Sequence, residues 1–340
     1  MNLRKRGTKR WAAALALASL GTVAAACGSG SSASSSNTTS ATTATTAVTP
    51  ATVNVGVLPI ADVAPLYLGI KQGFFAKQKL TVVPHALQGG AAVVSAVVGG
   101  SLDFGFGATA NLILASTHNL PVQFVAQGDQ AAATAADAWS GILVSGTSGI
   151  TSIKDLAGKT IASNALQGEN ELALDAVLQA NGVNPSSVHV VAMPFPSMPA
   201  ALAAGQVQAV TEVEPFVSAI EAKGGKLLSP LFEGMKPNLL VAGYFTTSSE
   251  IQKSPDLVKR FVTAINESLT YAAANPAAVR AIIPTYTSIP ASVAANLKLP
   301  VWAPTLQLST VQAQAQLMVQ LGWITTAPSI SSLVWSGAAQ

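Results

Sequence analysis

Strand and helix patterns alternate along this chain after a polar N-terminal stretch, and the alternation limits the fold more than any other feature. The strand patterns lie at residues 53–57, 80–83 and 102–106, and the helix patterns lie at residues 65–73 and 91–98. Alternating apolar residues mark the strands, whereas the helices repeat apolar positions every three to four residues. A chain with this order is predicted to form a parallel sheet covered by helices on both faces.

The loops that follow the strands are the expected ligand sites. In open parallel sheets, ligands bind beyond the carboxyl ends of the strands. Here those loops are residues 60–65, 87–90 and 107–111.

Part of this unit recurs later in the chain. Residues 91–110 and residues 196–215 both read as helix, glycine and strand. The recurrence predicts two lobes of one architecture. It also aligns Thr109 with Glu214, so that the two strand ends are expected to face one another across a cleft.

The N-terminus has the order of an export signal. Basic residues and an apolar run at residues 11–26 precede Cys27, the only cysteine of the chain. The run is shorter than the roughly 20 apolar residues that span a membrane, so a signal peptide is predicted over residues 1–26. The segment resembles bacterial lipoprotein signals, which implies acylation of Cys27. A plain secretory signal with an unmodified thiol is the alternative.

Removing the signal reverses the charge of the chain. Five basic residues leave with it, so 13 Lys and Arg remain against 15 Asp and Glu. No basic cluster remains, and we therefore exclude nucleic acid as a partner. The single cysteine excludes an internal disulfide. The Ser- and Thr-rich residues 27–51 are predicted to form a flexible linker.

Four segments of the chain resemble one family. They are residues 64–75 (APLYLGIKQGFF), 99–103 (GGSLD), 153–161 (IKDLAGKTI) and the pair Glu214-Pro215. In this order they are similar to the substrate-binding proteins of ABC importers for sulfonates, nitrate and thiamine-precursor pyrimidines. Gln208 departs from the family, which usually has Asp there, and this weakens any capping role at that turn.

The resemblance implies an α/β fold of the type 2 periplasmic-binding-protein class. Two doubly wound lobes are joined by two hinge strands, with a ligand cleft between them. The expected first lobe comprises residues 52–139 and 244–340, and the expected second lobe comprises residues 140–243, with a crossing near 137–142 and a return near 240–244. The implied protein is an extracytoplasmic, membrane-anchored monomer that closes over a small molecule and presents it to an ABC permease.

The charges at the expected cleft favour a neutral or cationic ligand. The only arginines beyond the signal, Arg260 and Arg280, fall in predicted C-terminal helices, so no arginine fork is placed to clamp an anion. Asp62, Glu169 and Glu214 fall at cleft loops instead. A polar heterocycle resembling an aminopyrimidine is therefore favoured over a sulfonate or nitrate, which backbone amides before a helix can still bind.

The candidate ligand-binding residues share a place at the expected cleft loops. They are Asp62, Tyr67, Gln88, Gly89, Gly90, Thr109, Asn111, Trp139, Gln167, Glu169 and Glu214. Several have simpler explanations: Asp62 and Thr109 as helix caps, Glu214 as a surface carboxylate, and Tyr67 as a lobe-surface residue.

An enzyme and a sensor are the competing classes. The implied fold also serves a desulfinase with a cysteine nucleophile and a pyrimidine synthase with a cysteine-rich iron site, yet Cys27 is the sole cysteine. His85, His118 and His189 have no metal-ligand spacing. We therefore expect no catalysis, no cofactor and no metal. A receptor that reports its ligand to a sensor partner remains open, because it would use the same closed form.

Overall fold

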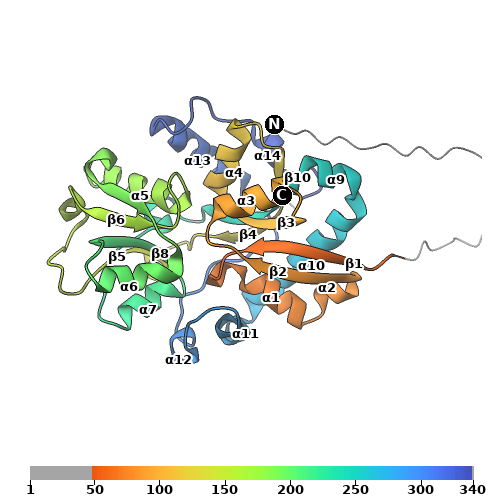
Figure 1. Ribbon diagram of the computed structural model, residues 1–340, viewed down its shortest axis with the longest axis horizontal. Helices are drawn as coiled ribbons and strands as arrows, with labels where there is room; N and C mark the ends of the chain where they lie inside the picture. The colour runs from red at the N-terminus through yellow and green to blue at the C-terminus, as the bar shows by residue number, and fades with distance from the viewer. Residues whose placement is uncertain (1–47, 339–340) are drawn as a thin grey trace, which may run out of the picture. The chain divides into compact units, whose positions relative to one another are not determined.

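The computed structural model describes residues 48–338, which build two five-stranded sheets (Figure 1). The predicted signal peptide, Cys27 and the linker up to Ala47 lie outside the described residues. In each lobe, helices follow most of the strands along the chain. The predicted α/β class with two sheets is confirmed.

The first sheet contains the N-terminal strands and one strand that returns from the middle of the chain. Its strands are β1 (Ala51–Val57), β2 (Leu80–Ala86), β3 (Phe104–Ala108), β4 (Val122–Gln130) and β10 (Leu240–Thr247). They lie in the order β2-β1-β3-β10-β4. β1 is parallel to β2 and β3, whereas β10 is antiparallel to β3 and β4.

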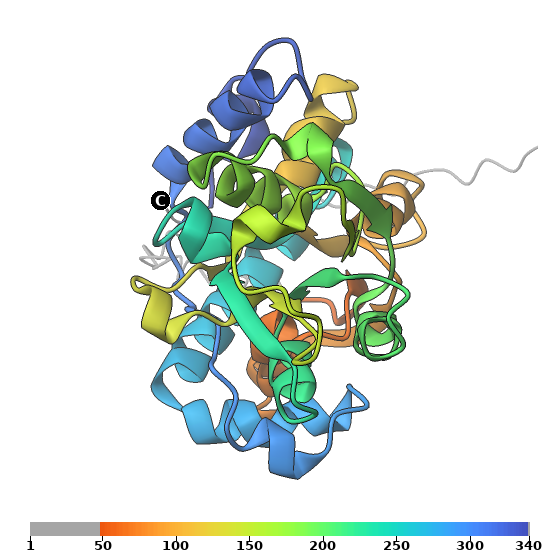
Figure 2. The same cartoon turned by 90° about the vertical axis from the view of Figure 1, so that its left-hand side faces the viewer.

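The second sheet repeats this plan, and its lobe faces the viewer in Figure 2. Its strands are β5 (Ser140–Val144), β6 (Thr160–Ser163), β7 (His189–Ala192), β8 (Ala209–Val213) and β9 (Lys226–Pro230). They lie in the order β7-β6-β8-β5-β9. β6 is parallel to β7 and β8, whereas β5 is antiparallel to β8 and β9. We call the parts around the two sheets the first lobe (48–130 and 240–338) and the second lobe (140–230).

The helices follow the strands as the apolar patterns predict. The first lobe has α1 (Ala64–Lys71), α2 (Phe74–Lys77), α3 (Gly90–Val98), α4 (Thr109–Thr117), α9 (Ser248–Lys253), α10 (Pro255–Ala274), α11 (Pro276–Ile282), α12 (Ala291–Ala294), α13 (Leu308–Gln320) and α14 (Ile330–Leu333). The second lobe has α5 (Glu169–Ala180), α6 (Met198–Ala203) and α7 (Phe216–Glu221). Among residues 48–338, no helix is both long and apolar enough to cross a membrane.

The predicted helix–glycine–strand repeat has the same hydrogen bonds in both lobes. The Asp103 carboxylate accepts the Asn54 N–H at 2.7 Å before β3, and the Gln208 side-chain oxygen accepts the Thr160 N–H at 3.1 Å before β8. Gln208 therefore does fill the position that the family usually gives to Asp. The bond is longer than the one to the Asp103 carboxylate and its acceptor is uncharged, which agrees with the expectation of a weaker cap at this turn.

Two segments connect the lobes; the outgoing one ends at the expected boundary between residues 139 and 140, whereas the return ends earlier in the chain than expected. The outgoing connection is residues 131–139, and the return is residues 231–239, which include the short helix α8 (Phe232–Met235). Residues 140–142 already pair within the second sheet, and residues 240–244 already pair within the first. The connections are loops, held together where the Glu233 carboxylate accepts the Ala132 N–H at 2.9 Å.

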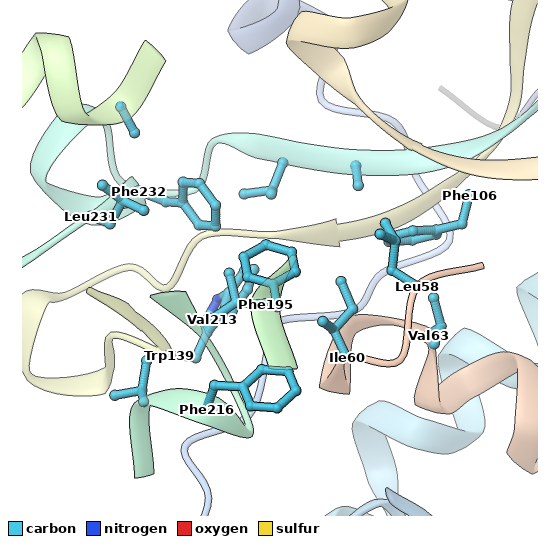
Figure 3. Packing of buried hydrophobic residues seen from close by; sticks show 14 of the residues in the cluster. Leu58, Ile60, Val63, Phe106, Trp139, Phe195, Val213, Phe216, Leu231 and Phe232 are labelled. Carbon is cyan, nitrogen blue, oxygen red and sulfur yellow. The ribbon is translucent and has the colours of Figure 1, made fainter. Parts of the chain in front are cut away.

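Buried apolar side chains continue from one lobe into the other. Figure 3 shows Leu58, Ile60 and Phe106 from the first lobe in the same cluster as Phe195 and Phe216 from the second. The lobes are therefore closed on one another, and the space between their sheets is largely filled by side chains.

Candidate functional site

A small cavity lies between the two sheets. Its volume is about 30 Å³, close to the volume of one water molecule in the liquid. An organic solute therefore needs the lobes to separate before it enters. The lining comes from the first lobe (Leu58, Ile60, Asp62, Gly90, Phe106, Ala108, Asn111, Val241, Ala242), the second lobe (Asn164, Glu169, Asn170, Phe195, Val213) and the return connection (Phe232).

Asp62 brings a carboxyl group to this cavity from the loop after β1. Its residue is 3% exposed, and its Oδ2 has no hydrogen-bond partner among the described residues. Two aromatic side chains hold the loop in place. The Trp302 indole N–H donates to the Asp62 carbonyl at 3.1 Å, and the Tyr286 hydroxyl donates to the Ile60 carbonyl at 3.1 Å. The position of Asp62 is thus fixed by backbone contacts.

Glu169 brings a second carboxyl group from the first turn of α5. Its Oε2 accepts the backbone N–H of Ala110 at 2.8 Å, at the start of α4 in the other lobe. This bond satisfies one of the amide donors that a helix leaves open at its start, and the carboxylate suits the positive end of the helix dipole. Glu169 Oε1 has no partner among the described residues. Glu169 therefore links the closed lobes and keeps one free acceptor.

Burial changes the protonation of both carboxyl groups. Desolvation raises the pKa of Asp62 from its ordinary 3.8 to about 7, although a bond from its own backbone N–H opposes the rise. Desolvation also raises the pKa of Glu169 from 4.5 to about 8, and the Ala110 N–H opposes it. The cavity thus holds two acids that titrate near neutral pH, where small changes in their surroundings change their charge.

Cationic side chains are absent from the cavity lining. The Arg260 guanidinium bonds to Asp256 and to the Gln78 carbonyl, and the Arg280 guanidinium bonds to the Leu297 carbonyl. Both arginines thus lie outside the cavity lining, as expected from their place in the C-terminal helices. The cavity offers carboxyl and amide groups in an otherwise apolar wall.

Four of the predicted residues lie in the lining: Asp62, Gly90, Asn111 and Glu169. A Cβ added at Gly90 would lie 3.2 Å from Asn111 Oδ1, so the glycine keeps the space beside that amide open. Whether these residues contact a ligand stays a prediction.

Thr109, Gln88, Gly89 and Gln167 lie near the cavity but outside its lining. Thr109 is fully buried and donates its hydroxyl to the Leu240 carbonyl at 2.8 Å. Gly89 precedes α3, and Gln88 is exposed. Gln167 is also exposed, and its N–H donates to the Glu171 carboxylate.

Tyr67 and Trp139 pack against other aromatic rings. Tyr67 stacks on Tyr286 with ring centroids 4.0 Å apart, so that one face of its ring is covered. Trp139 is fully buried beside Phe232, at 5.2 Å between centroids, and its indole N–H donates to the Gln130 carbonyl. Trp139 packs at the connection between the lobes, behind the cavity wall that Phe232 provides.

Glu214 is buried, and its own lobe satisfies its carboxylate. The Ser218 hydroxyl and N–H donate to it at 2.7 and 3.0 Å. With 1% of the residue exposed, the interpretation of Glu214 as a surface carboxylate was wrong. Its backbone carbonyl accepts the Ala61 N–H at 2.9 Å, so Glu214 contributes a backbone contact between the lobes.

Asp129 is a buried acid that the sequence analysis missed. It lies in β4 with no exposed surface, beside Asp62. A carboxylate within the otherwise uncharged strand segment 122–130 was the signal that could have identified it. Within residues 48–338, no group of three or more Asp, Glu, His or Cys side chains is arranged to hold a metal ion.

Another, larger groove lies elsewhere between α5 and the end of α13. Its volume is about 450 Å³, and Glu171, Asp175 and Gln320 are part of its lining. Desolvation raises the pKa of Asp175 to about 7, and the nearby Glu171 charge adds to the rise. The smaller cavity is the better candidate site, because it lies at the carboxyl ends of β1 and β6 and contains unpaired buried acceptors.

The fold is shared with solved binding proteins. The chain is similar to the alkanesulfonate-binding protein SsuA from Xanthomonas axonopodis pv. citri bound to MOPS, with 19% identity and a TM-score of 0.71 over 85% of this chain and 99% of that one. It is similar to the ligand-binding component of an ABC-type import system from Staphylococcus aureus with zinc bound, with 17% identity and a TM-score of 0.72 over 84% and 96%. It is also similar to the nitrate-binding protein NrtA from Synechocystis PCC 6803, with 14% identity and a TM-score of 0.70 over 83% and 84%.

At these identities the likeness shows the type 2 periplasmic-binding-protein fold. The comparison with curated proteins gives no match. A scan against protein families matches residues 60–279 to the family described as NMT1/THI5 like. Because the matched residues are more than half of the chain, the chain belongs to the NMT1/THI5-like family.

Proposed function

We propose that this chain is the solute-binding component of an ABC importer. Two lobes close over a small molecule outside the cytoplasm, and the closed form is delivered to a permease in the membrane. Family membership, the fold and its similarity to solved binding proteins, one of them from an ABC-type import system, support this role. The order of charges and apolar residues before Cys27 supports lipid attachment at that residue. We also propose that the protein acts as a monomer and catalyses no reaction.

The ligand in this proposal is a neutral or cationic molecule that carries hydrogen-bond donors. The observation that carries it is the pair of carboxyl groups, Asp62 and Glu169, which reach one cavity from opposite lobes: Glu169 Oε1 has no donor, and the only donor within reach of Asp62 Oδ2 among the described residues is the neighbouring Asp129 carboxyl group. A buried acceptor without a donor costs about 1–3 kcal/mol, so a ligand with N–H groups gains by supplying the donors. An anion would face two acids and no cationic side chain.

The apolar lining favours a flat ring as the body of the ligand. Phe106, Phe195 and Phe232 line the cavity from the two lobes and the return connection (Figure 3). Aromatic side chains bury large apolar areas and stack on flat rings. A heterocycle resembling an aminopyrimidine combines such a ring with N–H donors, and we propose a thiamine-precursor-like pyrimidine as the leading member of this class.

A sulfonate or nitrate is the second candidate. The backbone amides at the start of α4 favour it, because a helix N-terminus binds anions. In the closed form, however, the Glu169 carboxylate already bonds to the Ala110 amide of that turn. An anion would have to displace Glu169, and the donor-bearing ligand is therefore the better fit.

The test is a thermal-shift and calorimetric screen with defined probes. The panel contains 4-aminopyrimidine, benzylamine, ethanesulfonate and nitrate. A ligand that binds only the folded state stabilises it by about 2.7 kcal/mol at a hundredfold excess over Kd. We expect stabilisation by an N–H probe, weakened in Asp62→Asn and retained in the control Asp175→Asn. Stabilisation by the anions alone would overturn the ligand class.

A further inference from the structure

Asp129 and Asp62 form a pair of buried carboxyl groups at the base of the cavity. β4 packs against the turn Ala61–Val63, which brings the two side chains within hydrogen-bonding reach of one another once one of them is protonated. Asp62 lines the cavity, whereas Asp129 is fully buried behind it and does not. Both Asp129 oxygens and Asp62 Oδ2 lack a donor from any other described residue. Apart from their own backbone N–H groups, the two carboxyl groups therefore have only each other as hydrogen-bond partners.

Such a contact is stable only when a proton lies between the two groups. Two ionised carboxylates side by side repel one another, and burial raises the free energy of each charge further. One protonated carboxyl group removes the repulsion and donates a hydrogen bond to the other. In the described part of the chain the ion pairs are Lys77–Glu267 and Arg260–Asp256, so neither aspartate has a cationic partner.

The other titratable groups around the pair supply no positive charge. Tyr244 from β10, Tyr286 after α11 and Tyr67 from α1 face it, and burial raises the pKa of each phenol, so all three stay neutral at neutral pH. Glu169 faces Asp129 from the second lobe, and its charge would oppose ionisation of Asp129. None of these neighbours therefore favours loss of the proton from the pair.

We propose that Asp129 is a positioning residue that holds a shared proton with Asp62 in the closed, unliganded protein, and that this proton leaves to solvent when a protonated amine enters the cavity. The shared proton concerns the unliganded protein alone, whereas its release on binding rests on the proposed function. The exchange balances: one positive charge arrives with the ammonium group and one departs with the proton. Asp129 thereby sets the charge that Asp62 presents to a ligand.

The titration behaviour of the pair agrees with this geometry. Burial is the main cause that raises the pKa of both acids, to about 7 for Asp62 and well above the ordinary value for Asp129. The charge and hydrogen bond of Asp62 raise the pKa of Asp129 further, while the bond from Asp129 lowers that of Asp62. The two groups therefore titrate as a unit, and the proton belongs to the pair.

Carbon-13 NMR of aspartate carboxyl groups in the unliganded protein tests the shared proton. We expect the pair to retain at least one proton at pH 6 and the two signals to change together. Asp62→Asn should move the Asp129 midpoint to lower pH, because its charged neighbour is lost. Two fully ionised aspartates at pH 6, or an Asp129 midpoint unmoved by Asp62→Asn, would overturn the proposal.

Two variants of Asp129 separate its role in positioning from a role in folding alone. Asp129→Asn keeps a donor toward Asp62 and should leave the Asp62 midpoint near that of the wild type. Asp129→Ala removes the donor and should raise that midpoint. The control Asp175→Asn removes a buried acid whose only charged neighbour is Glu171 and should change neither signal. Equal midpoints in the Asn and Ala variants would contradict the assignment.

Titration of benzylamine in two buffers of different ionisation enthalpy tests the exchange. At pH 8 we expect net proton release on binding to the wild type and less in Asp129→Asn, in which Asp62, with a midpoint near 7, is already largely ionised. Binding without release in the wild type would refute the exchange while leaving the proposed function intact. Failure of both N–H probes to bind would instead refute the donor-bearing ligand, and the NMR titration would still decide the shared proton.

Discussion

Replacing Glu169 by alanine should shift the unliganded protein from the closed toward the open form. In the closed form the Glu169 carboxylate accepts the Ala110 N–H at 2.8 Å across the two lobes. Without the carboxylate this amide stays buried and unpaired, at a cost of about 1–3 kcal/mol, whereas opening returns it to water. The equilibrium constant for closing should therefore fall about 5- to 150-fold. Glu169→Gln keeps an acceptor and should lie between alanine and the wild type.

Single-molecule fluorescence transfer between the lobes measures this equilibrium directly. Dyes on cysteines placed at the exposed Lys71 and Lys223, with Cys27 replaced by serine, report one position on each lobe. Glu171→Ala is the matched control, because Glu171 lies half a turn along the same helix and accepts the Gln167 N–H of its own lobe. Distributions that coincide for Glu169→Ala, Glu171→Ala and the wild type would refute the interlobe role of Glu169.

Three further changes have defined outcomes. The unliganded protein should be more stable at pH 5 than at pH 9: acids such as Glu169, with a pKa raised from 4.5 to about 8, bind more protons folded than unfolded, so stability is lost as the pH rises through that window. Thermal unfolding across pH tests this, and a midpoint that rises with pH would contradict it. Gly90→Ala adds a Cβ 3.2 Å from Asn111 Oδ1 and should weaken binding of the best probe about tenfold, which calorimetry measures. Thermal unfolding should show no loss of stability, since alanine suits a helix better than glycine. Glu214→Ala removes the acceptor of both Ser218 donors and should lower the free energy of unfolding by about 1–2 kcal/mol in denaturant titration, with probe affinity unchanged; a large loss of affinity at unchanged stability would show that Glu214 contacts the ligand.

The fold was predictable because it follows from local patterns. Alternating apolar residues set the strands, and the repeated helix–glycine–strand unit indicated two lobes of one plan. The residue type of Gln208 indicated a weaker cap, and its hydrogen bond is longer than the one to Asp103. The return connection was placed too late in the chain, because residues 240–244 resemble a linker until their pairing partners in the first sheet are known.

The site was only partly predictable, because a sequence gives the loop and not the direction of a side chain. Asp62 and Glu169 follow strands and point into the cavity, as a position at a carboxyl end suggests. Glu214 also follows a strand, yet its carboxylate bonds to Ser218 in its own lobe. Trp139 was also expected at the cleft, yet its ring packs against Phe232 behind the cavity wall. Asp129 lies inside a strand, where only its charge among uncharged residues gives a signal.

A crystal structure of the protein with its tightest-binding N–H probe tests the central claim most directly. We predict density for the probe between the two sheets, with its N–H groups bonded to the free oxygens of Asp62 and Glu169 and its ring against Phe195 or Phe232. Density in the groove beside Glu171 and Asp175, or an ordered probe that contacts neither Asp62 nor Glu169, would contradict the account.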